Sequence, residues 1–415
     1  MAKIETIIKP NYLKQHSELT HKFNLHHGRH GWLRLTPAYS VKLVDQLLKN
    51  YDTDKVILDP FSGTGTTPLC AASKGYTVFG VEFNPFLVWL SEAKLANYSI
   101  TNESLIDIAK KIRYLVEQKK IEPINAPNIF NINRWWAKDS LEQLCRIKAG
   151  IEKCTDIGSD MRTLLDIAFC RTMISVSNAS FNHQSMSFQN QKATLYDNLL
   201  PSKFCDDVNY IMSSAVSHIL INNDKARIIR GDSKSIQNFL PSKVDIVITS
   251  PPYPNRMSYV RELRPYLYWL GYIKEAREAG NLDWDTIGGT WGIATSRLND
   301  WGVNSNEIFY PDDFLKIIEK IKKADGKNAL LLSKYLSKYF ADIWLHLQSL
   351  IKVLQPNAEV HYIVGNVSFY GNLVPVEQIY AGMMKELGFS KVEIITLRKR
   401  NSNRHLFEFD VHGSL

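Results

Sequence analysis

The chain has 415 residues, of which 45% are hydrophobic and 22% are charged, a composition that indicates an ordinary globular protein and excludes a disordered or fibrous one. The formal net charge of +8 favours a polyanionic partner such as nucleic acid. No run reaches the roughly 18 apolar residues needed to span a bilayer, and the first residues lack a signal-peptide pattern, so neither export nor membrane insertion is predicted.

The cysteines and histidines do not indicate a metal site. Five cysteines form an odd set without a Cys-x-x-Cys pair, which predicts neither a disulfide framework nor a zinc site and suits reduced thiols in a cytoplasmic protein. Several histidines crowd residues 1–30 at irregular spacing and without partner ligands, so we expect them on a surface or near an anionic ligand.

The first candidate site follows a short apolar strand at 55–58. Asp59-Pro60-Phe61-Ser62-Gly63-Thr64-Gly65 leads from this strand into a helix, and glycines there allow backbone N–H groups to approach a ligand closely. The next strand, 77–81, ends in Glu82, where a carboxylate can hold the two hydroxyls of a ribose. Without a third glycine, a nucleoside cofactor is favoured over a dinucleotide. The plainer alternative is a tight turn beside a solvated acid.

Helical patterns flank these strands and then replace them. A helix is predicted after Thr36-Pro37 and another at 85–95, which completes one half of a doubly wound sheet. Residues 100–225 are mainly helical, and within them Arg134-Trp135-Trp136 is a basic aromatic cluster. This cluster suits either contact with nucleic acid or packing of the tryptophans in a core, and both alternatives stay open.

The second candidate site follows the strand at 244–249. Ser250-Pro251-Pro252-Tyr253 forms a stiff loop, because neither proline can donate a backbone hydrogen bond. Its oxygens and its aromatic ring suit a planar group that carries an exocyclic amine, although a simple rigid turn is the alternative. One strand earlier, 226–230 leads to Asp232, an acid that can accept a hydrogen bond from an adenine amine.

The remainder of the chain returns to alternating elements. An arginine- and tyrosine-rich helix is expected after Tyr253, and residues 275–330 are expected to be irregular except for a helix that begins at Pro311. A strand at 359–364 precedes two terminal strands, whose connecting loop at 398–404 is strongly basic. We expect a hairpin whose tip faces solvent or phosphate, with a solvated basic turn as the alternative.

In this order the motifs DPFSGTGT, EFNP, GDS and TSPPY resemble those of the S-adenosylmethionine-dependent amino-methyltransferases of DNA found in restriction-modification systems. The resemblance implies an α/β fold with a doubly wound, mostly parallel seven-stranded sheet that ends in a β-hairpin. It divides the chain into a cofactor-binding half at 1–99, a helical insertion and candidate target-recognition region at 100–225, and a catalytic half at 226–415 with an irregular insertion at about 275–330.

The resemblance also implies roles for individual residues. S-adenosyl-L-methionine is the implied cofactor, and its binding residues are Thr36, Pro37, Asp59, Phe61, Ser62, Gly63, Thr64, Gly65, Glu82, Asp232 and Thr249. The implied catalytic residues are Ser250, Pro251, Pro252 and Tyr253. The implied nucleic-acid contacts are Arg256, Arg261, Arg398, Lys399, Arg400 and Arg404.

A serine before Pro-Pro-Tyr is usual in this family for enzymes that act on cytosine N4, whereas aspartate or asparagine is usual for adenine N6. The resemblance therefore implies methylation of cytosine N4 in double-stranded DNA by base flipping, with a separate restriction endonuclease as a partner. The alternatives are adenine-N6 methylation, methylation of RNA, and a nucleic-acid-binding protein without activity. Carbon-5 methylation needs a cysteine nucleophile, and no cysteine lies beside the candidate loop.

Overall fold

The computed structural model describes residues 6–7, 14–35, 38–156, 158–180, 187–188, 199–215, 221–256, 258–289, 293–302, 307–400 and 405–415. Three of the predicted site residues, Thr36, Pro37 and Arg404, lie outside these ranges, so their roles stay predictions.

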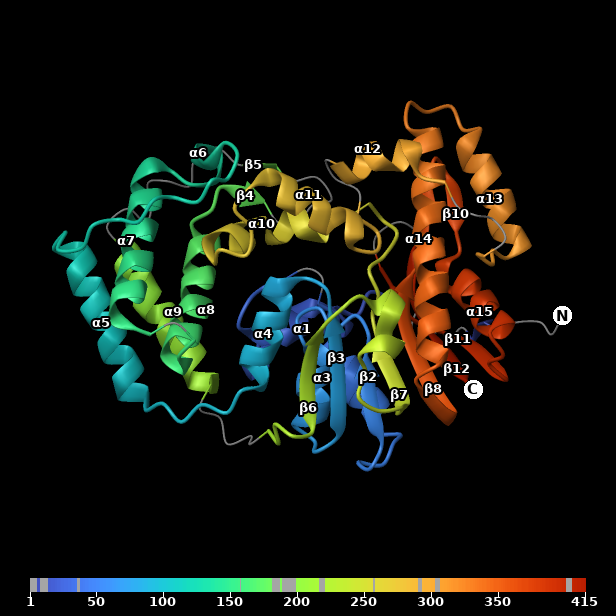
Figure 1. Ribbon diagram of the computed structural model, residues 1–415, viewed down its shortest axis with the longest axis horizontal. Coiled ribbons are helices and arrows are strands. Elements are labelled where there is room, and N and C mark those ends of the chain that lie inside the picture. Colours follow the sequence, from blue (N-terminus) through green and yellow to red (C-terminus); the bar gives the residue numbers. More distant parts are fainter. Residues whose placement is uncertain are drawn as a thin grey trace.

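A mixed sheet forms the centre of the molecule (Figure 1), with strand order β1-β11-β12-β8-β7-β2-β3-β6. The strands are β1 (Thr6–Ile7), β2 (Val56–Asp59), β3 (Thr77–Glu82), β6 (Ala226–Arg230), β7 (Val244–Thr249), β8 (Leu354–Gly365), β11 (Lys391–Lys399) and β12 (Phe407–Ser414). The run from β6 to β8 is parallel, whereas β12 pairs antiparallel with both β8 and β11. The predicted seven-stranded, doubly wound sheet with its terminal hairpin is confirmed, and the two-residue β1 adds an edge strand.

Helices cover both faces of the sheet because successive strand residues point to opposite sides. Ile57 and Ile246 pack with residues of α2 (Val41–Leu48) and α3 (Thr66–Ala72). Leu58 and Val247 pack with α14 (Ala329–Ile351) and α15 (Val376–Glu386) on the other face. The near-continuous apolar run of β7 therefore reflects burial on both sides.

The predicted helical insertion is present as a layer beside α4 (Pro85–Leu95), as Figure 1 shows. Its helices are α5 (Asn102–Glu117), α6 (Ile132–Trp135), α7 (Lys138–Cys154), α8 (Asp160–Ser175) and α9 (Leu200–Ala215). Trp135 and Trp136 are buried, and Trp136 packs edge-on against Trp269 at a centroid distance of 5.8 Å. Both tryptophans therefore pack in the core, which was the alternative to contact with nucleic acid.

The prediction of an irregular segment at 275–330 is wrong. The segment contains α11 (Ala276–Asp285) and α12 (Ile293–Asp300) in addition to the expected α13 (Asp312–Lys322). Helix α11 begins with a capping box between Glu275 and Glu278. Its buried residues include the acid Asp283, which breaks the apolar periodicity that would reveal a helix in the sequence.

Among the described residues, two further strand pairs lie outside the main sheet, β4 (Ala179–Ser180) with β5 (Ser187–Phe188) and β9 (Val367–Phe369) with β10 (Asn372–Val374). Helix α10 (Tyr259–Trp269) follows the Ser-Pro-Pro-Tyr loop, and its residues join the core of the helical insertion. No helix in the described ranges combines the length and apolar character that crossing a membrane requires.

Two glycines with left-handed backbones offer a test of the loop after β2. Gly65 has φ +74°, and a Cβ atom there would lie 2.8 Å from the Ser91 hydroxyl, whereas Gly75 has φ +87° and open space around it. We expect Gly75→Ala to lower the free energy of unfolding by only about 1–2 kcal/mol from backbone strain. Gly65→Ala should lower it by about 1–3 kcal/mol more because of crowding. Equal losses in chemical denaturation would contradict this account of the loop.

Candidate active site

A cavity of about 620 Å³ lies at the carboxyl ends of the parallel strands, where β2 and β7 stand side by side. In a doubly wound sheet this is the position at which strand order reverses and ligands bind. Its walls come from the segment 15–22, the glycine loop at 59–65, the ends of β3 and β6, the Ser-Pro-Pro-Tyr loop at 250–253, α10 and the terminal hairpin. The predicted residues that line it are Phe61, Gly63, Glu82, Asp232, Ser250, Pro251, Pro252, Tyr253, Arg398 and Arg400.

A second group of predicted cofactor residues lies beneath the loop instead of on the cavity wall. Asp59, Ser62, Thr64 and Thr249 are all buried, and the Asp59 carboxylate accepts hydrogen bonds from the Thr249 hydroxyl (2.6 Å) and the Phe61 amide (3.1 Å). Burial raises the pKa of Asp59 to about 6. These side chains fix the path of the loop that presents its backbone to the cavity.

Glu82 ends β3 and bridges the loop to the next helix. Its carboxylate accepts from the backbone N–H of Gly63 (2.8 Å) and from that of Asn84 (2.7 Å). Burial raises the pKa of Glu82 to about 7, although the two N–H groups act in the opposite direction. A carboxylate held in this way can accept hydrogen bonds from hydroxyl groups in the cavity.

Asp232 follows β6 and caps the 3₁₀ helix η4 (Ser233–Asn238). Its carboxylate accepts from the Lys234 amide (2.9 Å) and forms an ion pair with the Lys234 ammonium group (3.2 Å). Its side chain is 34% exposed and lines the cavity. It therefore remains accessible as an acceptor for a polar ligand edge.

His346 of α14 was not predicted, and it supports two parts of the wall at once. A carbonyl oxygen can only accept, so the Nδ1–H of His346 donates to the Ser233 carbonyl (3.0 Å), and Nε2 accepts from the Tyr362 hydroxyl (2.6 Å). The ring also meets Phe61 edge-on at 4.6 Å. Burial lowers the pKa of His346 to about 4, which keeps the imidazole neutral.

The Ser-Pro-Pro-Tyr loop is fixed through its oxygen atoms. The Ser250 hydroxyl donates to the Ile363 carbonyl of β8 (3.1 Å), so the lone pairs of Ser250 remain available to accept a hydrogen bond. On the other side of the loop, the Pro252 carbonyl accepts from the Tyr339 hydroxyl (2.8 Å). The two prolines thus sit between a strand and a helix that both belong to the last third of the chain.

Tyr253 is oriented by the terminal hairpin. Its hydroxyl donates to Glu408 of β12 (2.9 Å), and Glu408 also forms an ion pair with Arg398 (2.7 Å). The guanidinium group of Arg400 lies over the Tyr253 ring, 4.9 Å from its centroid. Glu408 was missed because it reads as one more residue of an amphipathic strand.

The other predicted nucleic-acid contacts differ in exposure. Arg256 is exposed at a positive φ of 61°, and Lys399 is half-buried. Arg261 is only 9% exposed, and its role as a nucleic-acid contact stays a prediction. It lies three residues after the helix cap Ser258, where α10 is buried on nearly every side.

Lys94 of α4 is another residue that the motifs do not reveal. It is 1% exposed, and its ammonium group donates to the Thr64 carbonyl within the glycine loop at 59–65 (2.8 Å). Burial lowers its pKa to about 7. A lysine on the buried side of a mainly apolar helix is the sequence signal for this contact.

Comparison with known proteins agrees with the resemblance found in the motifs. The chain is 23% identical to the type II methyltransferase M.BsoBI of Geobacillus stearothermophilus, an alignment that covers 93% of this chain and 83% of the relative. It is 22% identical to the type II methyltransferase M.MvaI of Kocuria varians, over 89% and 82% of the two chains. It is also 22% identical to the type II methyltransferase M.AvaI of a Nostoc species, over 95% and 87%.

These relatives confirm the predicted resemblance to the methyltransferases of restriction-modification systems, and it extends over almost the whole chain. No family model matches the chain, and no solved structure matches it.

The buried lysine predicts a specific dependence of stability on pH. Between about pH 7 and pH 10.5 Lys94 is neutral in the folded state but protonated in the unfolded chain, so the free energy of unfolding should rise with pH. The contribution is at most about 1.4 kcal/mol per pH unit. Lys94→Met should flatten this rise in denaturant titrations at several pH values. The exposed Lys110→Met serves as the control, and an unchanged slope in Lys94→Met would refute the assignment.

Proposed function

We propose that the protein is an S-adenosylmethionine-dependent DNA methyltransferase that acts on the exocyclic N4 of cytosine in duplex DNA, within a restriction-modification system. One observation carries the proposal: a single cavity joins the glycine loop, Glu82 and Asp232 to the Ser-Pro-Pro-Tyr loop. The type II methyltransferases that resemble the chain support the same class of reaction.

The cavity suits a nucleoside cofactor. Its volume of about 620 Å³ falls within the range of about 300–1,000 Å³ typical of small-molecule sites. Gly63 presents backbone at the wall with φ +51°, Glu82 would accept from the ribose hydroxyls, and Asp232 would accept from the adenine amine. When bound, S-adenosylmethionine supplies an electrophilic methyl group on a sulfonium.

Ser250 and Pro251 would activate the amine of the base. The lone pair of an aromatic amine is delocalised into the ring, so the nitrogen is a poor nucleophile. If the Ser250 hydroxyl oxygen and the Pro251 carbonyl accept its two hydrogens, the nitrogen becomes more tetrahedral and its lone pair becomes available. The donation from Ser250 to the Ile363 carbonyl favours this acceptor role. Positioning and hydrogen bonding then supply the catalysis, without a covalent intermediate.

The target base would have to leave the duplex, at a cost of a few kcal/mol, to reach the loop. Arg400 covers one face of the Tyr253 ring, so the extruded base would stack on the opposite face. The hydrogen bond from the Tyr253 hydroxyl to Glu408 fixes the plane of the ring. Tyr253 would therefore act as a preformed stacking surface.

DNA binding would rest on cations near the loop. Arg400 lines the cavity. Arg256 comes three residues after Tyr253 in the sequence, and Lys399 directly precedes Arg400. The net charge of +8 favours the same polyanion. A cognate endonuclease, as the restriction-modification assignment implies, would act as a separate protein.

The proposal is tested by Ser250→Ala and Tyr253→Ala, assayed on duplex DNA and on structured RNA with radiolabelled S-adenosylmethionine. Both variants should lose at least about 100-fold in methyl transfer because each removes a contact made to the reacting base. Cofactor affinity, measured by calorimetry, should remain unchanged. Ser337→Ala, which removes a half-buried hydroxyl from α14, should retain full activity.

Mass spectrometry of the digested nucleic acid identifies the modified nucleoside. N4-methylcytosine supports the proposal, and N6-methyladenine or labelled RNA would replace it with one of its alternatives. Full activity in Ser250→Ala would remove the proposed role of the hydroxyl. Absence of S-adenosylmethionine binding in the unaltered protein would overturn the proposed function itself.

Glu82 predicts that cofactor affinity depends on pH. Its pKa of about 7 means that the carboxylate, which accepts from two hydroxyls, predominates only above that pH. Affinity should therefore fall below pH 7, by at most about tenfold per pH unit. In calorimetric titrations between about pH 6.5 and about pH 8.5, Glu82→Gln should bind more weakly with little pH dependence. If cofactor affinity in Glu82→Gln still depended on pH as it does in the unaltered protein, Glu82 would not be the cause. Asp59, whose pKa is also raised, would then be the candidate.

A further inference from the structure

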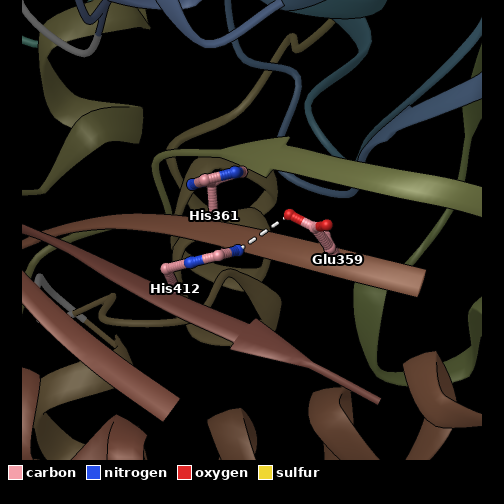
Figure 2. Close-up of side chains that lie close together, drawn as sticks. All are labelled: Glu359, His361 and His412. Atoms are coloured by element: carbon pink, nitrogen blue, oxygen red, sulfur yellow. Dashed lines mark hydrogen bonds and ion pairs between the residues drawn. The ribbon is translucent and has the colours of Figure 1, made fainter. Parts of the chain in front are cut away.

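We propose that Glu359 and His361 of β8 and His412 of β12 bind a divalent transition metal of the zinc class. Their ligand atoms all lie within 4.8 Å of one another, and Figure 2 shows the three side chains gathered on one side of the two strands. None of them lines the cavity described above. The proposal is therefore independent of the methyltransferase assignment.

The register of two antiparallel strands creates the cluster. His412 stands directly opposite His361 in the ladder, and their rings stack at 4.5 Å with an interplanar angle of 4°. Glu359 precedes His361 by two residues on β8, so both side chains project from the same face. The two paired strands thus bring two imidazole nitrogens and a carboxylate together, although His412 is far from the other two residues in the sequence.

Asp410 orients the ring of His361 so that Nε2 faces the cluster. The Nδ1 of His361 lies 2.8 Å from a carboxylate oxygen of Asp410, which can only accept, so Nδ1 carries a proton. Nε2 lies 2.7 Å from the Tyr51 hydroxyl, whose own proton goes to Glu359, so Nε2 donates to Tyr51 here and would release that proton on binding a metal. A carboxylate behind the ring in this way is the usual outer partner of a metal-bound histidine. Asp410 is 2% exposed, and among the described residues its other oxygen has no hydrogen-bond partner.

His412 has a comparable arrangement. Its Nε2 lies 2.9 Å from Glu359 and its Nδ1 lies 3.8 Å from Glu393 of β11. On metal binding, His412 would coordinate through Nε2 as the neutral tautomer that carries its proton on Nδ1, toward Glu393. The proton on Nε2 would leave for solvent, and a ring that is neutral beforehand would take up a proton from solvent on Nδ1. Each histidine would then have one nitrogen on the metal and a carboxylate behind the other.

The Tyr51 hydroxyl lies between two of the ligands. It is 2.7 Å from both Glu359 and the Nε2 of His361, and Glu359 lies 2.9 Å from His412. Bonds of about 2.0–2.1 Å in a tetrahedral zinc site place ligand atoms about 3.3 Å apart. The ligand atoms, which lie within 4.8 Å of one another, would shift to that spacing and the stacked imidazoles would tilt so that both Nε2 atoms face the metal, with Tyr51 or a water in the fourth position.

The donor set and the charge favour a dication of this class. Within the described residues, the ion pairs of Glu359 and Asp410 are made only with His361 and His412, so two carboxylates share the pocket without a permanent cation. Imidazole nitrogens favour zinc and related transition metals, whereas calcium and magnesium prefer sites made of oxygen alone. The Glu359 side chain is 36% exposed, which provides a path from solvent.

A metal here would connect β8 and β12, the two strands that hold the Ser-Pro-Pro-Tyr loop. Ile363, which accepts from Ser250, lies two residues beyond His361 on β8. Glu408, which accepts from Tyr253, lies two residues before Asp410 on β12. The site would therefore clamp β8 to β12 and stabilise the native state by mass action.

The test uses the full-length protein, freed of metal by a chelator and titrated with Co²⁺ while visible absorption is recorded. One equivalent should bind with tetrahedral ligand-field bands, and Zn²⁺ should displace it. His361→Gln and His412→Gln should abolish stoichiometric binding, and Asp410→Asn should weaken it about 10–100-fold as an outer-partner substitution. The exposed His26→Gln should bind as the unaltered protein does.

Glu359→Gln keeps the proposal testable if the histidine variants do not fold, because its side chain is partly exposed. Zn²⁺ should raise the melting temperature of the unaltered protein and leave that of a folded Glu359→Gln unchanged. Absence of stoichiometric Co²⁺ binding in the unaltered protein would overturn the proposal. Binding that persists undiminished in Glu359→Gln and in either histidine variant would overturn it equally, since the ion would then lie elsewhere.

Discussion

The site depends on one buried hydrogen bond, which the Thr249 hydroxyl donates to the Asp59 carboxylate at 2.6 Å. It joins the last residues of β7 and β2, which are parallel neighbours in the sheet. Because parallel strands end at the same edge, the loops that follow these two residues leave the sheet side by side. Burying an acid is unfavourable, and the raised pKa of Asp59 reflects this. Its place beneath both loops explains why an acid is nonetheless useful there.

The Ser-Pro-Pro-Tyr loop, predicted to be catalytic, is held by hydrogen bonds to oxygen atoms because its prolines offer no N–H groups. Pro251 and Pro252 offer no N–H donors, so the loop is held through the Ser250 hydroxyl, the Pro252 carbonyl and the Tyr253 hydroxyl. Their partners come from β8, α14 and β12 respectively. A loop in the middle of the chain is therefore set in place by elements that are synthesised last, and its geometry requires the complete sheet.

Local patterns predicted the strands, the loops at their ends and the order in which they occur, because each of these features is contained within a few neighbouring residues. The supporting contacts were not predictable in this way. Lys94 reaches a carbonyl 30 residues away, and His346 reaches one 113 residues away. Each is one polar residue among several in its helix, and nothing in the local pattern marks it as buried. The burial of Arg261 was likewise not predictable, because composition near a loop does not reveal which helical residues are buried.

The histidine cluster shows the same limit in its clearest form. The spacing of Glu359, His361 and His412 matches no metal motif, and only the antiparallel register of β8 and β12 brings them together. Residues at i, i+2 and i+4 on one strand face share a side, so Glu408, Asp410 and His412 form one row. The first orients Tyr253 and the others surround the proposed metal. A shift of β12 by one residue would therefore disturb both sites together. The register of the terminal hairpin is thus coupled to the geometry of the Ser-Pro-Pro-Tyr loop.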